Sequence, residues 1–507
     1  MRAINIASIE ANIEANSGAG IRDNNRATTG PASVWVATTT APEFPVLMSH
    51  ERADVCVIGA GIAGLTTAYM LRRAGKSVVV IDAAGVGAGE SGRTSAQFFP
   101  PDERYFDIER GFGTAKAALV ADVYNKATDC VESIIRSERI DCEFERLDGY
   151  LFSPDATWDD ILEREHAVTS RLGLDVRRLE RVPGLHFDTG PCLRFARQAQ
   201  FHPLKYLNGL AEAIIKQGGR IFDRTRALAL HGDSAHQSVL TDHGSVVAGS
   251  VVVCTDTPFN DRAAIHTRQT GYRSYVLGIR VPKDALPRML LWDTGVPYYY
   301  VRLTDTGPEA DHELLIVGSP DHTSGQDAHP QQQRQQEQQE QERYDQIEAW
   351  VRQRFPLAGD VEYRWSGVIS EPSDGMPFLG RSAHDHDNVY IITGDSGNGM
   401  THCTAGAILV SDLICGRKNA WTDMYSPARK AFHGIGDFLT EQANTEARFN
   451  DWLRGGDVDS IGEIAAREIA PAKGAPLCDD GTQLANCRAG DGGLPALPAG
   501  AGAPAFA

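Results

Sequence analysis

The sequence predicts an α/β protein in which a parallel βαβ domain is joined to a second, discontinuous β-rich domain. Three observations support this. Residues 54–82 read as strand, glycine-rich turn, helix and strand, and residues 388–415 repeat the order strand, glycine loop, helix. Residues 270–320 are rich in aromatic and β-branched residues. Short apolar runs such as VCVI at 55–58 are typical of strands that are buried in a parallel sheet.

The first βαβ unit carries the pattern G-x-G-x-x-G directly after its first strand. Gly59 permits the tight turn, Gly61 lets the backbone approach a pyrophosphate, and Gly64 lets the helix pack closely on the strand. The second strand ends at Asp82, whose carboxylate can accept hydrogen bonds from ribose hydroxyl groups. Strand, glycines, helix and acid together predict a dinucleotide site. The alternative is a βαβ unit whose glycines are incidental.

Two further glycine-rich loops are candidates for cofactor contacts. Residues 85–96 form a Gly/Ser/Thr loop with one arginine, Arg93, and such loops can donate backbone N–H groups to a ligand. Residues 394–402, GDSGNGMTH, lead into an apolar helix whose N-terminus supplies N–H donors and a partial positive charge. The alternatives are a flexible surface loop for the first and an ordinary strand–helix turn for the second.

The aromatic segment of the second domain contains a candidate substrate-binding strand. Alternate residues of a strand point to the same side, so Tyr298, Tyr300 and Arg302 share one face. Tyrosine and arginine together suit a pocket that orients a polar or carboxylate-bearing substrate. An ordinary half-exposed strand face is equally compatible, because aromatic residues fit strands for packing reasons alone.

Composition excludes several classes of partner. The net charge is −18 and the pI is about 5.3, which argues against nucleic acid or an anionic membrane surface as a main partner. Nine cysteines are scattered without a C-x-x-C pair, as expected of free thiols in a reducing compartment. We find neither an apolar stretch long enough for a membrane span nor the pattern of a signal peptide, and therefore expect a cytoplasmic location.

The domain boundaries follow from the order of these segments. We expect the dinucleotide-binding domain at 33–110, 200–265 and 361–455, and the second domain at 111–199 and 266–360. Residues 1–32 and the low-complexity tail 456–507 are aperiodic, and we expect disorder in both. The Gln-rich run at 331–342 either extends the helix that follows it or forms a solvated insertion.

Taken together, the motifs resemble the D-amino-acid-oxidase-like FAD-dependent oxidoreductases, the group of glycine oxidase, sarcosine oxidase and γ-glutamylputrescine oxidoreductase. The resemblance covers residues 33–458, and its motifs occur in family order: VCVIGAGIAGLTTAYMLRRAGKSVVVID, GESGRTSA, DCEFERLDGYLF, RQAQFHPLKYL, VRL, EYRWSG, DGMPFLGR and GDSGNGMTH. In particular, the chain resembles a bacterial branch that often carries a C-terminal Rieske iron–sulfur domain. The Rieske ligand pattern, C-x-H followed by C-x-x-H, is absent from this sequence. We therefore expect no metal site, and electrons must leave to oxygen, a quinone or a separate carrier.

The resemblance implies FAD, held by a Rossmann-like domain, with the β-rich domain on the substrate side. The implied FAD-binding residues are Gly59, Gly61, Ile62, Ala63, Gly64, Asp82, Gly92, Arg93, Thr94, Ser95, Thr255, Gly397, Asn398, Gly399, Met400 and Thr401. The implied catalytic set has Arg302 as a carboxylate-binding residue, with Tyr300 and His402 as candidates for assisting deprotonation. His402 could equally cap or pack the final helix. Cys403 stands where the branch usually has glycine.

The reaction implied by the resemblance is oxidation of a C–N bond in a small amine or amino acid by hydride transfer to the flavin, as in enzymes acting on CH–NH₂ or CH–NH groups. Two alternatives remain open: an FAD-dependent dehydrogenase of a hydroxy acid or alcohol, and a non-catalytic electron-transfer flavoprotein subunit. An NAD-binding interpretation is the weakest, because the loop at 394–402 would then have no ligand.

Overall fold

The computed structural model describes residues 32–429, with gaps at 102–103, 155–158, 261–264, 266–267, 296, 308, 324–329 and 384. Beyond residue 473 it describes only the backbone of three short strands. The segment 1–31, most of the region where we expected N-terminal disorder, lies outside the described residues.

The first sheet contains the predicted parallel core. Its strand order is β16-β17-β10-β1-β2-β7, with β9 and β8 attached beside β10. Neighbours from β17 to β7 run parallel, and β16 and β9 are antiparallel to their partners. The strands are β1 (His50–Ile58), β2 (Val78–Ile81), β7 (Arg220–Phe222), β8 (Ala227–Gly232), β9 (Gln237–Thr241), β10 (Ser245–Val253), β16 (Phe378–Arg381) and β17 (Val389–Thr393). The apolar runs of β1 and β2 are fully buried, which confirms their assignment to the interior of a parallel sheet.

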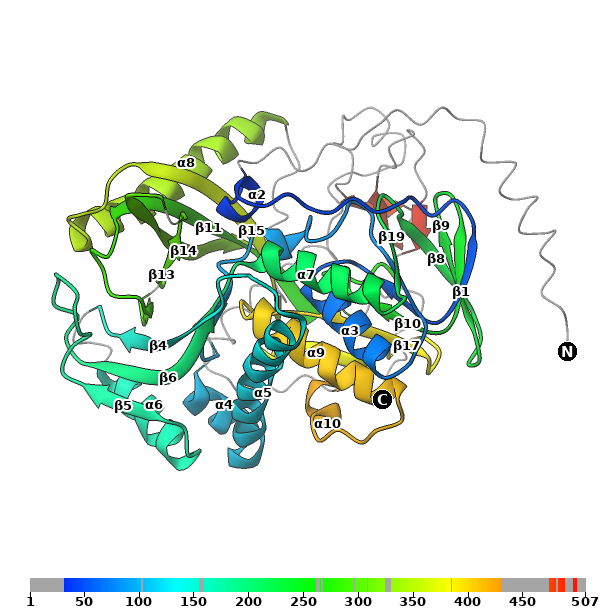
Figure 1. The fold of residues 1–507 in the computed structure, drawn as a ribbon, viewed down its shortest axis with the longest axis horizontal. Helices are drawn as coiled ribbons and strands as arrows, with labels where there is room; N and C mark the ends of the chain where they lie inside the picture. The colour runs from blue at the N-terminus through cyan, green and yellow to red at the C-terminus, as the bar shows by residue number, and fades with distance from the viewer. Residues whose placement is uncertain are drawn as a thin grey trace, which may run out of the picture. The chain divides into compact units, whose positions relative to one another are not determined.

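Four helices form a packed layer beside this sheet (Figure 1). They are α3 (Ile62–Arg73), α5 (Thr114–Glu138), α7 (Pro203–Lys216) and α9 (Gly399–Ile414). Helix α3 packs against both α7 and α9, and α5 packs against α9. The two helices that begin at glycine loops, α3 and α9, are therefore direct neighbours, and both loops lie at the same end of the layer. Helix α5 comes from the segment 111–199, which we expected in the second domain.

The second sheet is mostly antiparallel, with strand order β15-β11-β14-β13-β12-β4-β6-β3 and β5 beside β6. One pair, β12 with β4, is parallel. The strands are β3 (Gln97–Phe98), β4 (Glu145–Phe152), β5 (Val176–Leu179), β6 (Cys192–Gln200), β11 (Gln269–Pro282), β12 (Leu290–Asp293), β13 (Tyr300–Asp305), β14 (His312–Thr323) and β15 (Val361–Pro372). Strand β15 begins where we expected the first domain to resume, but it pairs along its length with β11 in this sheet. The observed boundary therefore differs from the expected one by a whole strand.

The Gln-rich run is part of a helix. Helix α8 (Pro330–Arg354) is continuous through it, which decides between the two alternatives that the sequence left open. The helix packs on β11 and β14 and lies across the second sheet in Figure 1. Its C-terminal half supplies apolar residues to the core of this sheet, among them Ile347, Trp350 and Val351.

Shorter elements complete the fold: α2 (Val34–Ala37), the 3₁₀ helix η1 (Glu90–Gly92), α4 (Tyr105–Phe112), α6 (Asp159–Arg171) and α10 (Thr422–Tyr425). In the tail the backbone forms β18 (Gly474–Asp479), β19 (Thr482–Cys487) and β20 (Ala496–Pro498), which pair as an antiparallel sheet. The other residues of the tail 456–507, which we expected to be disordered, lie outside the described residues. In the described part of the chain, no helix is both long and apolar enough to cross a membrane.

Candidate functional site

A cavity of about 570 Å³ lies between the two sheets and contains most of the predicted cofactor residues. Its walls come from the ends of β1, β2, β10 and β17, from the loop around η1, and from β11, β13 and β15 of the second sheet. In open α/β sheets, ligands bind outside the carboxyl ends of the parallel strands, which is where this cavity lies.

The turn between β1 and α3 forms the floor of one end of the cavity. Gly59 has φ +109°, and a Cβ atom there would overlap the carbonyl of Cys254, so the turn requires glycine. At Gly61 the backbone lines the cavity, and the first N–H of α3, that of Ile62, donates to Oγ of Ser91 at 3.0 Å. Ile62 and Ala63, the next two predicted residues, also line the cavity. The glycine turn and the N-terminus of a helix, with its partial positive charge, suit a pyrophosphate, so this turn fits the phosphates of FAD.

Gly64 lies behind the turn and does not line the cavity. A Cβ at this position would overlap the carbonyl oxygen of Gly59, so its absence allows α3 to start close to β1. The structure thus places Gly64 as a packing residue, in the role that the motif assigns to its third glycine.

Asp82 lies at the end of β2 and is held by backbone amides. Its Oδ2 accepts from the N–H of Ala60 at 2.7 Å, and its Oδ1 accepts from Ala84 and Gly85 at 2.8 Å each. A carboxylate offers about four acceptor positions, so Asp82 can still accept from a ribose hydroxyl. Thr225, Arg226 and Ala227 line the same cavity.

In the loop that follows η1, three of the four predicted residues line the cavity: Arg93, Thr94 and Ser95. Arg93 also donates from Nη1 to the carbonyl of Ser366 at 3.2 Å, which ties the loop to β15. Gly92 is buried behind the loop, where its N–H donates to Gly89 at 3.1 Å. Its contribution is therefore to the shape of the loop.

Only some of the predicted residues around the N-terminus of α9 face the cavity. Gly397, Gly399 and Met400 line the cavity, as does Thr255 at the end of β10. Asn398 and Thr401 are buried away from it: the Asn398 side chain donates to Ser396 at 3.3 Å, and Thr401 is 1% exposed. Successive residues of a helix are rotated by about 100°, so a contiguous run cannot face one ligand.

Tyr300 lies on the wall that the second sheet contributes to the cavity. Its hydroxyl is 2.9 Å from Oγ of Ser274, which also lines the cavity, and either group can be the donor. Tyr298 lines the same wall, with its ring centroid 6.2 Å from that of Tyr300. Tyr299 points to the other side of the strand and stacks on Trp350.

Arg302 requires a correction. It shares the buried face with Tyr300, but it is not among the residues that line the cavity. Its side chain is 1% exposed, and Nη1 donates to the carbonyls of Ser95, Ala96 and Phe201 at 2.8–3.0 Å. Strand alternation predicted the face correctly, but residues 95–96, directly before β3, and Phe201, directly after β6, cover the guanidinium of Arg302. The guanidinium holds backbone in place and is not positioned to bind a substrate carboxylate.

His402 lines the cavity, but both ring nitrogens have protein partners. Nδ1 is 2.7 Å from the carbonyl of Asp395 and must donate to it, because a carbonyl only accepts. Nε2 of the neutral ring then accepts from the hydroxyl of Tyr124 at 3.1 Å. Burial lowers the pKa of His402 to about 4, so the ring is neutral near pH 7. This arrangement favours the capping and packing role that we left open over a role as general base.

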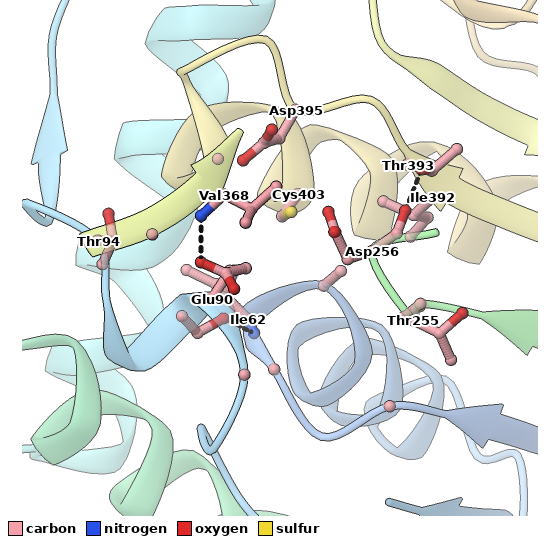
Figure 2. A pocket seen from close by; sticks show the side chains of 18 of the residues that line it. Ile62, Glu90, Thr94, Thr255, Asp256, Val368, Ile392, Thr393, Asp395 and Cys403 are labelled. Atoms are coloured by element: carbon pink, nitrogen blue, oxygen red, sulfur yellow. Dashed lines mark hydrogen bonds between the residues drawn. The ribbon is translucent and has the colours of Figure 1, made fainter. Parts of the chain in front are cut away.

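Three carboxylates of the cavity were missed by the sequence analysis: Glu90, Asp256 and Asp395. Figure 2 shows them coming from three separate segments around one space, with Cys403 between them. Glu90 accepts from Val368 N–H at 2.8 Å, and Ser370 donates to Asp395 from its N–H and to Asp256 from its hydroxyl. Each acid sits in a loop directly beside a glycine motif or after a buried strand, and that position is the signal that could have identified them.

The three acids influence one another. Burial raises the pKa of each, and the nearby charges of Asp256 and Glu90 raise the pKa of Asp395 further, to about 8. Like charges in one cavity disfavour simultaneous ionisation. Cys403 and Cys254 also line the cavity, and burial raises the pKa of both thiols. No group of three metal-ligating side chains occurs among the residues that the structure describes.

Comparisons with known proteins agree with this geometry. Residues 54–413 match the family described as DAO, FAD dependent oxidoreductase. The chain is 28% identical over 453 residues to the putative Rieske 2Fe-2S iron-sulfur protein YhfW of Bacillus subtilis, covering 89% of this chain and 85% of that protein. It is 26% identical to γ-glutamylputrescine oxidoreductase of Escherichia coli, and the match covers 74% of this chain and 86% of that protein. The crystal structure of glycine oxidase from Geobacillus kaustophilus superposes with a TM-score of 0.61 at 17% identity, covering 75% of this chain and 99% of that one.

The raised pKa of Asp395 predicts a pH dependence of stability. Between its usual value near 3.8 and about 8, the folded protein binds this proton more tightly than the unfolded chain. The stabilising contribution is fully present below this window and is lost as the pH rises through it. The free energy of unfolding of the FAD-free protein should therefore fall less from about pH 5 to about pH 8 in Asp395→Asn than in the wild type.

Urea unfolding at the two pH values measures this difference. Asparagine keeps the Oδ1 acceptor for the N–H of Ser370, so the comparison isolates the charge. Asp54→Asn is the control, because hydrogen bonds from Ser77 lower the pKa of Asp54 and its titration lies below the window. If the free energy of unfolding fell equally from about pH 5 to about pH 8 in the wild type and in Asp395→Asn, the raised pKa of Asp395 would be contradicted.

Proposed function

The chain belongs to the DAO family of FAD-dependent oxidoreductases, and on that premise we propose that it oxidises a C–N bond in a small, positively charged amine or amino acid. When bound, FAD supplies the redox chemistry by accepting a hydride from the carbon beside the nitrogen. The residues that would hold it are the turn at 59–63, Asp82, the loop at 93–95 and the N-terminus of α9.

The observation that carries this proposal is the charge of the cavity. Three carboxyl groups, Glu90, Asp256 and Asp395, line it together, and Arg93 and Arg273 both act on Glu90. Burial and mutual repulsion raise the pKa of these acids, so a protonated amine bound among them would favour their ionised forms, whereas the anion of a 2-hydroxy acid would oppose them. The proposal is consistent with a relative named γ-glutamylputrescine oxidoreductase and with a structural neighbour named glycine oxidase.

Three groups of the chain then have distinct tasks. The substrate nitrogen must lose its extra proton before the adjacent C–H bond breaks. Asp395, whose pKa is raised to about 8, is the group that would take that proton on a carboxylate oxygen when it is ionised. The hydroxyl of Tyr300 can donate to Ser274 and accept from the substrate N–H, which would orient the nitrogen. His402, with both nitrogens engaged, holds the start of α9 in position.

Neutralising one acid tests the role of charge. For the best substrate in a panel of primary and secondary amines, Asp256→Asn should lower kcat/KM on the order of tenfold, because one attractive charge is lost. Asp412→Asn, in an ion pair with Arg417 on the surface, should leave kcat/KM unchanged. Unchanged kcat/KM in Asp256→Asn, or a gain with amines, would remove the carboxylates from substrate selection.

The Tyr300 hydroxyl has a matched control in the preceding residue, Tyr299. Tyr300→Phe keeps the ring on the cavity wall but removes the hydroxyl next to Ser274, and kcat/KM should fall about tenfold, as for the loss of one hydrogen bond. Tyr299→Phe alters the ring that stacks on Trp350, on the opposite face, and should have no such effect. Equal kinetics for the two variants would show that the Tyr300 hydroxyl does not orient the substrate.

A further inference from the structure

Five consecutive carbonyl groups of the loop beside the cavity, residues 92–96, are held from outside by side chains of distant segments. The donors are Ser33 to Gly92 at 2.6 Å, Trp365 to Arg93 at 2.8 Å, Trp35 to Thr94 at 2.7 Å, and Arg302 to Ser95 at 3.0 Å and Ala96 at 2.8 Å. Such complete outside pairing is unusual for a loop, because loops generally direct their carbonyl groups to water.

This pairing determines which way the N–H groups point. In a trans peptide the N–H is directed opposite to the C=O of the same unit. The N–H of Thr94 therefore points away from the indole of Trp365, and the N–H of Ser95 points away from the indole of Trp35. Both residues line the cavity. The neighbouring amides of Arg93 and Ala96 are used within the loop, where they donate to Glu90 O and Thr94 Oγ1.

Trp35 and Ser33 belong to a short segment, residues 33–40, that we call the N-terminal strap. Trp35 is 1% exposed, and its ring lies 5.1 Å from the guanidinium carbon of Arg302. Ser33 caps α2 by accepting from Val36 N–H while its hydroxyl donates to Gly92. The strap precedes the region that matches the family, residues 54–413.

The far end of the strap is anchored on α7. His202 caps α7 by accepting from Lys205 N–H through Nδ1, so Nε2 of the neutral ring carries the proton. Nε2 lies 3.0 Å and 3.1 Å from the hydroxyl oxygens of Thr38 and Thr39, to which it can donate. Burial lowers the pKa of His202 to about 3, so this anchor persists at neutral pH. Asn208 adds a bond to the Thr40 carbonyl at 3.0 Å.

We propose that the N-terminal strap is a positioning element of the FAD site: Trp35, together with Trp365, holds the amides of Thr94 and Ser95 as fixed donors toward the flavin. Donors that are already oriented need no reorganisation, so they strengthen FAD binding and stabilise the negative charge that reduction adds to the ring. Trp35 acts only through the loop and is a positioning residue. The inference depends on FAD binding and is independent of which substrate the enzyme oxidises.

Trp35→Phe isolates the hydrogen bond, because phenylalanine keeps an aromatic ring beside Arg302 and His202 but lacks Nε1–H. We expect the FAD dissociation constant of the purified protein to rise about tenfold and the flavin midpoint potential to fall. Trp365→Phe should shift both quantities in the same direction, because it acts on the neighbouring peptide.

Trp421→Phe is the matched control. Trp421 is 3% exposed and donates Nε1–H to Asp122 at 3.2 Å, on a part of the helix layer that does not line the cavity. It should lower the melting temperature of the FAD-free protein without changing the FAD dissociation constant or the potential. If Trp35→Phe behaved like Trp421→Phe, with lower stability but unchanged affinity and potential, the proposal would be overturned.

A second variant covers the case in which Trp35→Phe does not fold. Ser33→Ala removes the hydroxyl that holds the Gly92 carbonyl and caps α2, and it should shift affinity and potential in the same direction by a smaller factor. Unchanged values for Ser33→Ala would then overturn the proposal. Neither measurement requires a substrate, so an error in the proposed C–N oxidation would leave this test intact.

Discussion

The close approach of the turn at Gly59 to the end of β10 is the constraint on which the site depends. A side chain at Gly59 would overlap Cys254, and one at Gly64 would overlap Gly59, so the two glycines let β1, β10 and α3 meet with no side chain between them. This contact leaves the N-terminus of α3 facing the cavity, and Asp82 is tied back to the same turn through its hydrogen bond from Ala60 N–H. The pyrophosphate and ribose positions of FAD are thus built from one local unit of chain.

The substrate side depends on a different kind of contact, between segments far apart in sequence. Ser370, at the end of β15, donates to Asp395 and to Asp256 and accepts from Ser396 N–H, so it joins the second sheet to the loops that follow β10 and β17. The carboxylates that we assign to amine recognition are therefore also part of the joint between the two sheets. The hydrogen bonds from Ser370 offset part of the cost of burying these two acids.

Local patterns predicted what depends on local structure: the parallel strands, the glycine turns, and the residues of the 85–96 and 394–402 loops that reach the cavity. They did not predict which neighbours cover a strand. Arg302 shares the correct face with Tyr300, but its guanidinium is covered by Ser95, Ala96 and Phe201, and only long-range packing shows this. The pairing of β15 with β11 likewise depends on a partner about ninety residues away. The three acids of the cavity come from three separate loops, and the sequence of one loop does not indicate that the other two lie beside it. A contiguous run such as 397–401 predicts too many ligand-binding residues, because successive residues of a helix point in directions about 100° apart.

The central claim is that FAD in this cavity oxidises the C–N bond of a cationic amine. The most direct test is the visible absorption spectrum of the purified protein, recorded anaerobically before and after addition of amines, amino acids and 2-hydroxy acids. We predict the bands of oxidised flavin and their bleaching by members of the amine or amino-acid classes only. Bleaching by 2-hydroxy acids alone, or flavin bands that persist with every compound, would contradict the claim, and the second result would favour an electron-transfer subunit.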